Sequence, residues 1–211
     1  MTYLTELIDG YHRFRHKDWA RERERWSDLA EGQSPGIMIL SCADSRVDPA
    51  QIFDARPGEM FVVRNIAALA PPYETSRGYH GVSAALEFAV TQLGVGEILV
   101  MGHGMCGGCA AGLTGEFQDT DHGEGHFIAD WVRMLDDARD DVRARHATLD
   151  RDAFRDMEWE AVKVSLANLR TFPWITEREE AGDLTLHGAH FSIAEGRLYM
   201  LDEAEGKFRP V

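Results

Sequence analysis

The order of apolar and polar positions along the chain predicts a helical start, followed by strands and helices in alternation. Between residues 3 and 30, apolar residues recur at helical spacing among many charges, which is typical of one or two amphipathic helices. Short apolar runs predict buried strands at 36–40, 59–64 and 97–101. Residues 82–93 have helical spacing and end before Gly94, a common helix terminator. A strand, a helix and a strand in this order favour a right-handed crossover and a parallel sheet.

The second half of the chain continues the alternation. Helical spacing predicts helices at 125–146 and 151–171, and Pro173 is expected to end the second one. Alternating positions predict strands at 183–187 and 197–201, with a hairpin turn at Glu195 and Gly196. Residues 114–125 are rich in Gly, Asp and His and predict a mobile loop, where we expect His122, and His126 beside it, to be solvated.

These elements together predict one α/β domain over residues 1–211. We expect a central, mainly parallel sheet flanked by helices, with an N-terminal helical arm at residues 1–30. A chain of 211 residues is long enough for one substantial core and does not require a second.

Charge and cysteine content narrow the function. A net charge of −14 and a pI near 5.0 argue against nucleic acid or an anionic membrane as partner. No apolar stretch approaches the roughly 20 residues of a membrane span, and the N-terminus lacks a signal-peptide pattern, so we expect a cytoplasmic protein. Three cysteines are an odd number, which favours metal binding or redox chemistry over a disulfide framework.

Two short strings concentrate the candidate chemistry. They read Cys42-Ala43-Asp44-Ser45-Arg46 and His103-Gly104-Met105-Cys106-Gly107-Gly108-Cys109. Each follows a predicted strand, so on neighbouring parallel strands both strings emerge side by side at the carboxyl ends, where open α/β sheets place their ligand sites. Two thiolates and one imidazole suit zinc and leave a fourth position open, which is typical of a catalytic rather than a structural site.

Each residue of these strings also has a simpler interpretation. Cys42 alone is typical of a small core residue, Asp44 of a turn acceptor, and His103 of a buried histidine. Cys106-Gly-Gly-Cys109 opens a predicted helix after a strand, as a thiol redox pair does. Spacing alone does not decide between the two cysteines as ligand, but the tight His-x-x-Cys turn favours Cys106. Asp44 and Arg46 are close enough to pair, with the arginine orienting the carboxylate.

Taken with Arg64-Asn65-Ile66-Ala67, the two strings resemble the β-class carbonic anhydrases, from about residue 33 to residue 115. The resemblance implies one zinc ion per chain held by Cys42, His103 and Cys106, and a catalytic Asp44–Arg46 pair. It leaves Cys109 outside the ligand set. It also implies a substrate pocket of Gln33, Phe61, Ile66 and Phe88, where Phe88 replaces a tyrosine often found there. Gly107 is expected to offer its N–H to an anion at the start of a helix.

The implied activity is reversible hydration of carbon dioxide to bicarbonate and a proton by attack of zinc-bound hydroxide. Gln33 is expected to donate its amide to a substrate oxygen, and Asp44 to accept the hydroxide proton. The resemblance further implies a homodimer, possibly a tetramer, in which the arm at residues 1–30 packs on the partner and the pocket is shared between subunits. The apolar face of that arm supports this independently, because such a face is expected to pack on another surface.

Three other functions fit part of the sequence. A carbon disulfide-type hydrolase uses the same site behind a narrower entrance. A non-catalytic zinc module or a thiol redox protein is a different class. The Asp44–Arg46 pair argues against the last two, because neither needs a proton acceptor beside an open metal position.

Overall fold

The computed structural model describes residues 2–117 and 126–211, so most of the predicted loop at 114–125, including His122, lies outside the described residues. The chain forms two compact units, residues 1–34 and 35–211. Helices α1 (Tyr3–Phe14) and α2 (Arg23–Glu31) and the π-helical segment η1 (Arg15–Trp19) make up the first unit, in agreement with the predicted helices at 3–30. Within the described part of the chain, no helix is long and apolar enough to cross a membrane.

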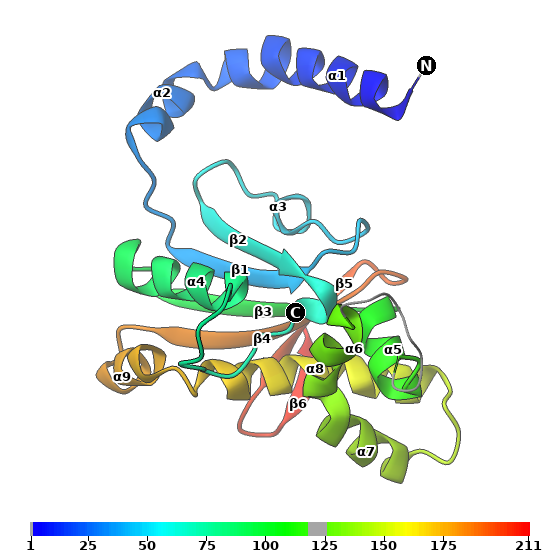
Figure 1. The fold of residues 1–211 in the computed structure, drawn as a ribbon. Helices are drawn as coiled ribbons and strands as arrows, with labels where there is room; N and C mark the ends of the chain where they lie inside the picture. The colour runs from blue at the N-terminus through cyan, green and yellow to red at the C-terminus, as the bar shows by residue number, and fades with distance from the viewer. Residues whose placement is uncertain (1, 118–125) are drawn as a thin grey trace. The chain divides into compact units, whose positions relative to one another are not determined.

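The second unit is built on a sheet whose described strands lie in the order β2-β1-β3-β4-β5-β6 (Figure 1). The strands are β1 (Ile37–Cys42), β2 (Met60–Asn65), β3 (Glu97–His103), β4 (Thr185–Ser192), β5 (Arg197–Asp202) and β6 (Lys207–Pro210). Strands β2, β1, β3 and β4 pair in parallel, while β5 and β6 add to the sheet in antiparallel fashion. The prediction of a mainly parallel sheet is therefore confirmed, and β1 lies between β2 and β3.

Helices connect and cover these strands (Figure 1). They are α3 (Pro49–Ile52), η2 (Ile66–Ala68), α4 (Gly81–Glu87), η3 (Phe88–Gln92), α5 (Gly107–Thr114), α6 (Phe127–Val132), η4 (Arg133–Leu135), α7 (Asp136–Arg145), α8 (Arg151–Leu169) and α9 (Pro173–Ala181). The predicted helix at 151–171 corresponds to α8. The predicted helix at 125–146 was wrong as one element, because the chain forms α6, a 3₁₀ turn and α7 there. Pro173 follows α8 as predicted but also begins α9.

The two faces of the sheet carry separate buried clusters. Met38 and Leu40 of β1 point toward α8, where they join Val162 and Leu166 in the larger core. Ile39 points to the opposite face, in a cluster that also contains Ile52 and Phe53 from the α3 region. Helix α8 packs against β3 and β4 and also contacts α5. Its N-terminal half therefore lies next to the carboxyl ends of the central strands, where both sequence strings begin.

Candidate metal centre

Cys42 and His103 are the last residues of the neighbouring parallel strands β1 and β3. The register pairs Ser41 with Met101, so the two ligands emerge at nearly the same level of the sheet. Both are buried, with 5% of Cys42 and 1% of His103 exposed. The juxtaposition predicted from the sequence is therefore present in the structure.

A tight turn brings Cys106 back to the same point. Met105 has a φ of 59°, in the left-handed region that residues with a Cβ seldom adopt. Cys106 is then the N-cap of α5 and is 2% exposed. A strained residue persists only where its surroundings hold it, and Arg46 Nη2 donates a 2.9 Å hydrogen bond to the Met105 carbonyl oxygen.

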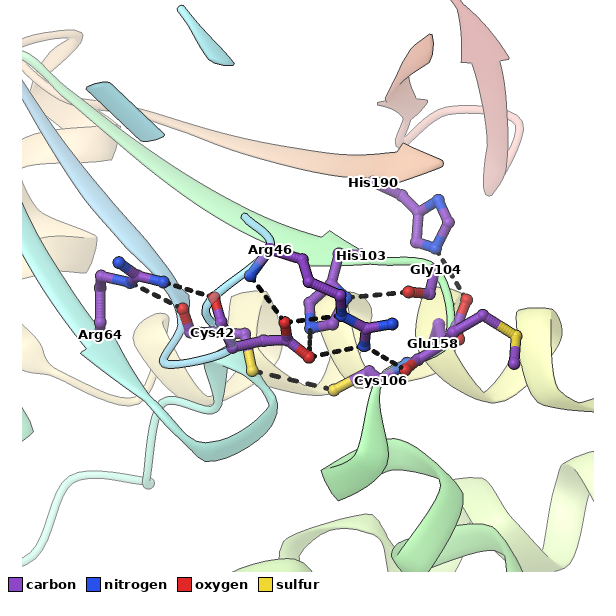
Figure 2. A network of polar contacts seen from close by, with 10 residues as sticks. Cys42, Arg46, Arg64, His103, Gly104, Cys106, Glu158 and His190 are labelled. Carbon is purple, nitrogen blue, oxygen red and sulfur yellow. Dashed lines mark hydrogen bonds and ion pairs between the residues drawn. The ribbon is translucent and has the colours of Figure 1, made fainter. Parts of the chain in front are cut away.

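The three candidate ligands converge as a metal requires. Their ligand atoms lie within 4.8 Å of one another, and the Sγ atoms of Cys42 and Cys106 are 3.9 Å apart. Two sulfurs at about 2.3 Å from one tetrahedral zinc ion would be roughly 3.8 Å apart, close to this separation. Figure 2 shows both thiols directed toward one another beside the His103 ring.

The protonation of His103 also fits a metal ligand. Its Nδ1 lies 2.9 Å from the carbonyl oxygen of Gly104, and because a carbonyl only accepts, Nδ1 carries the proton. Nε2 is then a free lone pair, and it is buried without a hydrogen-bond partner. An imidazole oriented through its other nitrogen is the usual arrangement in metal sites. This orphaned nitrogen, aimed at two thiols, shows that the residues present fit zinc.

The two thiols must lose their protons before they can bind a metal ion, and a nearby cation favours that loss. Contact with the Cys106 thiol, followed by burial, raises the pKa of Cys42 to about 12. Contact with Cys109, together with burial, raises the pKa of Cys106 to about 12. Both groups are therefore protonated near neutral pH in the metal-free chain, and a bound divalent ion reverses this preference by stabilising the thiolates.

Asp44 and Arg46 form the predicted pair. Arg46 donates from Nε to Oδ1 at 2.9 Å and from Nη2 to Oδ2 at 2.7 Å, and its backbone N–H also donates to Oδ1. The hydrogen bond from the Arg46 side chain is the main cause that holds the pKa of Asp44 well below its usual range. Oδ2 lies 3.9 Å from Nε2 of His103, so an ionised carboxylate faces the point where the ligands converge.

Arg64 supports this loop, a role that the sequence reasoning missed. Its Nε donates to the Cys42 carbonyl oxygen at 2.9 Å and its Nη2 to the Asp44 carbonyl oxygen at 2.6 Å. Its Nη1 lies 3.2 Å from Asp48, whose carboxylate caps α3. The sequence signals were the position of Arg64 at the end of a predicted strand and its place in the string Arg64-Asn65-Ile66-Ala67, and neither shows that its side chain reaches this loop.

The predicted pocket residues divide into two groups. Ile66 directly follows Asn65, the register partner of Cys42, and contacts the start of α5, so it lies beside the centre. Phe61 and Phe88 lie together, with ring centroids 6.0 Å apart. Phe61 is paired with Met38, four positions before Cys42, which is about 13 Å along the strand.

The remaining candidates lie elsewhere or in the turn. Gln33 belongs to the first unit and Gly107 is the first residue of α5. Cys109 is buried within α5 but does not belong to the convergent group of three among the described residues. His126, the N-cap of α6, is exposed, as expected.

Comparisons with known proteins agree with this geometry. A family model described as carbonic anhydrase matches residues 37–198. Beta carbonic anhydrase 3 of Arabidopsis thaliana is 36% identical over 194 residues, which cover 92% of this chain and 74% of that protein. The chain belongs to the β carbonic anhydrase family. Members of this family hydrate carbon dioxide and use zinc, and the convergent Cys42, His103 and Cys106 are a group that could hold such an ion here.

Solved structures of the family share the whole fold. The structure of the beta-carbonic anhydrase CcaA superposes with a TM-score of 0.91 at 31% identity and covers 100% of both chains. A beta-carbonic anhydrase of Sordaria macrospora, described as tetrameric, gives a TM-score of 0.78 at 27% identity and covers 94% of this chain and 96% of its own. The six-stranded sheet of the described residues is thus the sheet of this family.

Proposed function

We propose that this chain catalyses the reversible hydration of carbon dioxide to bicarbonate and a proton, with one zinc ion per chain held by Cys42, His103 and Cys106. The observation that carries the proposal is the Asp44 carboxylate, fixed by two hydrogen bonds from the Arg46 side chain at 3.9 Å from the free nitrogen of His103. A structural zinc site or a thiol redox pair has no use for a proton acceptor at this position.

The residues of the chain divide the work. Zinc, when bound, lowers the pKa of a water ligand toward neutrality. Asp44 accepts a hydrogen bond from the attacking group and so directs its lone pair toward the carbon of the substrate. Arg46 keeps the carboxylate in this orientation, because two parallel hydrogen bonds allow little rotation. Ile66 supplies an apolar wall for carbon dioxide beside the centre, and Gly107 offers a backbone N–H at the start of α5.

We further propose that two subunits complete the substrate pocket. Phe61 lies about 13 Å along the sheet from the level of Cys42, and Phe88 packs beside it with ring centroids 6.0 Å apart, so we infer that both are too far away to line the centre of their own chain. Phe88 is 45% exposed in the single chain, as expected for a side chain that becomes buried against a partner subunit. In a homodimer, one subunit would contribute Gln33, Phe61 and Phe88 to the centre of the other.

The proposal is tested by metal content together with the rate of carbon dioxide hydration. The purified protein should contain about one zinc ion per chain and hydrate carbon dioxide, as followed by stopped flow with a pH indicator. Removal of zinc with a chelator should abolish the rate, and added zinc should restore it. A zinc-loaded protein without hydration activity would contradict the proposal.

The rivals give different results in parallel assays. A carbon disulfide-type hydrolase would release hydrogen sulfide from carbon disulfide and hydrate carbon dioxide slowly. A redox protein would reduce a disulfide substrate through Cys106 and Cys109, and zinc would inhibit it. We expect neither activity to approach the rate of hydration.

A further inference from the structure

Glu158 is a buried acidic residue that neither sequence string contains. It lies in the N-terminal half of α8, and only 4% of the residue is exposed. A buried carboxylate must be hydrogen bonded to compensate for lost hydration. Its Oε1 accepts a hydrogen bond from the backbone N–H of Cys106 at 3.2 Å, and its Oε2 lies 2.9 Å from Nε2 of His190.

His190 holds this carboxylate in place from the other side. It lies on β4 and is 3% exposed. An N–H on Nε2 of His190 is the donor that fits a carboxylate oxygen of Glu158 at this distance. Figure 2 shows Glu158 between His190 and the turn of Cys106. Three elements that are far apart in sequence thus meet at one side chain.

The hydrogen bond from Cys106 N–H to Glu158 is one of two that hold the peptide group between Met105 and Cys106. The carbonyl oxygen of Met105 and the N–H of Cys106 belong to the same peptide group, and in a trans peptide they point in opposite directions. Arg46 Nη2 donates to that oxygen at 2.9 Å, while Glu158 accepts from that N–H at 3.2 Å. Both ends of the peptide are therefore held, which keeps it from shifting or tilting in the turn.

A shift of this peptide would displace a metal ligand. A change in φ of Met105 swings the whole peptide and the Cα of Cys106 that follows it, so the Cβ of Cys106, which carries the thiol, would move with them. Met105 has a strained φ of 59°, so loss of either hydrogen bond would favour relaxation of this angle. A hydrogen bond on one end alone leaves the peptide free to tilt.

We propose that Glu158 is a positioning residue that, together with Arg46, clamps the peptide between Met105 and Cys106 and so aims the Cys106 thiolate at the metal. This inference rests on the proposed role of Cys106 as a zinc ligand. Arg46 then has two tasks, since the same guanidinium orients Asp44 and holds the turn of Cys106. Loss of an outer hydrogen-bond partner of a metal ligand commonly reduces metal affinity by about 10–100-fold.

Three substitutions separate the geometry from the charge. E158Q keeps an oxygen acceptor for Cys106 N–H and an amide that can contact His190. E158L has a similar size but no acceptor, and E158D keeps the charge but is shorter by one methylene. An alanine is less suitable, because a cavity of about 490 Å³ reaches Glu158 and could supply a water in its place. The matched control is D156N on the same helix, which removes the charge of a carboxylate that lies 2.8 Å from His146 at the end of α7.

The test uses the full chain loaded with cobalt(II) or zinc(II), below the melting temperature of each variant. The readouts are the cobalt–thiolate absorption bands and the rate at which a chelator removes zinc. E158L should show altered bands and release zinc about 10–100-fold faster, while E158Q and D156N should resemble the parent protein. If E158L does not fold, the comparison of E158D with E158Q decides, and E158D should be the impaired variant.

Two results would overturn the inference. One is an unchanged spectrum and release rate in E158L, or in E158D where E158L does not fold. The other is an E158Q variant as impaired as E158L or E158D, which would assign the effect to charge rather than to position. Failure of the proposed function is distinguishable, because the parent protein itself would then fail to bind metal through thiolates or to hydrate carbon dioxide.

Discussion

Asp44 is subject to two opposing attractions. A metal at the convergent ligands would draw the carboxylate toward it as a fourth ligand, and the Arg46 guanidinium draws it away. The two hydrogen bonds of 2.7 and 2.9 Å from the Arg46 side chain hold the carboxylate in the second arrangement. Charge-assisted bonds of this geometry are among the stronger contacts in proteins, so we expect the fourth position of a bound zinc ion to stay open for water.

The first prediction concerns this carboxylate. D44N should keep its zinc, because the three ligands are intact, but should hydrate carbon dioxide about 10²–10⁴-fold more slowly, as is typical for loss of a group that handles a proton. R46A should also be slow, since the freed Asp44 can close on the metal. Zinc content and pH–rate profiles near pH 8 check both variants. A near-normal rate in D44N would refute the role of Asp44.

The second prediction separates the two cysteines of the turn. C109S should retain zinc and most of the hydration rate, because Cys109 lies outside the convergent group. C106S should lose most of both, since it removes a ligand. Metal analysis after dialysis measures the outcome, and loss of zinc from C109S would show that the ligand assignment is wrong.

The third prediction follows from the raised pKa values. With the pKa of Cys42 and of Cys106 at about 12, both thiols bind protons throughout the range from pH 7.5 to 9, and zinc binding must release both. Apparent zinc affinity should therefore rise with pH by at least about 100-fold per pH unit, and by more where the zinc-bound water also loses its proton. Competition with a chelator of known pH dependence measures the slope. A slope of one proton would mean that one thiolate already exists without metal.

At this scale the sequence revealed only what lies in contiguous strings. Cys42, Asp44 and Arg46 share one loop, and His103 and Cys106 share one turn, so their spacing carries the chemistry. Glu158 and His190 meet the turn through tertiary packing of α8 and β4, and no local pattern distinguishes them from other polar residues. The tight turn after His103 was predicted from the His-x-x-Cys spacing, but that spacing does not indicate that Met105 adopts the left-handed conformation.

Among the elements, α5 and η2 approach each other closely at Gly108. A Cβ at this position would lie 2.7 Å from Cγ2 of Ile66 and 3.0 Å from the Cβ of Ala67. Neither atom is the end of a flexible chain, and Ala67 itself has a φ of 62°. The start of α5 can therefore pack this closely on η2 only through a glycine.

The fourth prediction tests this contact. G108A should destabilise the protein by about 1–3 kcal/mol, the usual cost of adding a methyl group to a packed site. G107A is the matched control for stability, because a Cβ there meets nothing within 4 Å. Denaturant unfolding of the two zinc-loaded variants compares them, and equal stabilities would contradict the close approach.

The elements that the sequence reasoning missed depend on context. Pro173 was expected only to stop a helix, but a proline is also favoured at the first position of one, where α9 begins. Strand β6 contains one buried residue, Phe208, and ends in a proline that only an edge strand tolerates, so it forms because β5 offers an edge. The longer apolar runs of β1 and β3 need no such help and were predicted correctly.

At the scale of the whole molecule, the first unit presents apolar side chains that its own fold leaves exposed. Along α1 these are Tyr3, Leu4, Leu7, Ile8, Tyr11 and Phe14. Their spacing of three and four residues forms a stripe along the helix. An apolar surface of this kind marks an interaction site, which supports the proposed dimer.

The fifth prediction tests assembly. Deletion of residues 1–30 should weaken self-association by more than about tenfold, because each large apolar side chain contributes roughly 1.5–3 kcal/mol when buried. Activity should fall in parallel if the pocket is shared. L7K should act in the same direction and E6K should not, since Glu6 is polar already. Sedimentation and hydration rates at one concentration check the expectation, and a fully active monomer would exclude the shared pocket.

The two sulfur ligands also have a mechanical consequence. Cys42 and Cys106 are 64 positions apart in the sequence, and they lie at the end of β1 and in the turn after the neighbouring strand β3. An ion that holds both closes the intervening chain into a loop, much as a covalent cross-link would, and restricts the unfolded ensemble. Part of the free energy of zinc binding is then free energy of folding. A bound zinc ion therefore acts as a reversible cross-link between the ends of β1 and β3, and its loss would lower the free energy of unfolding as well as abolish the activity.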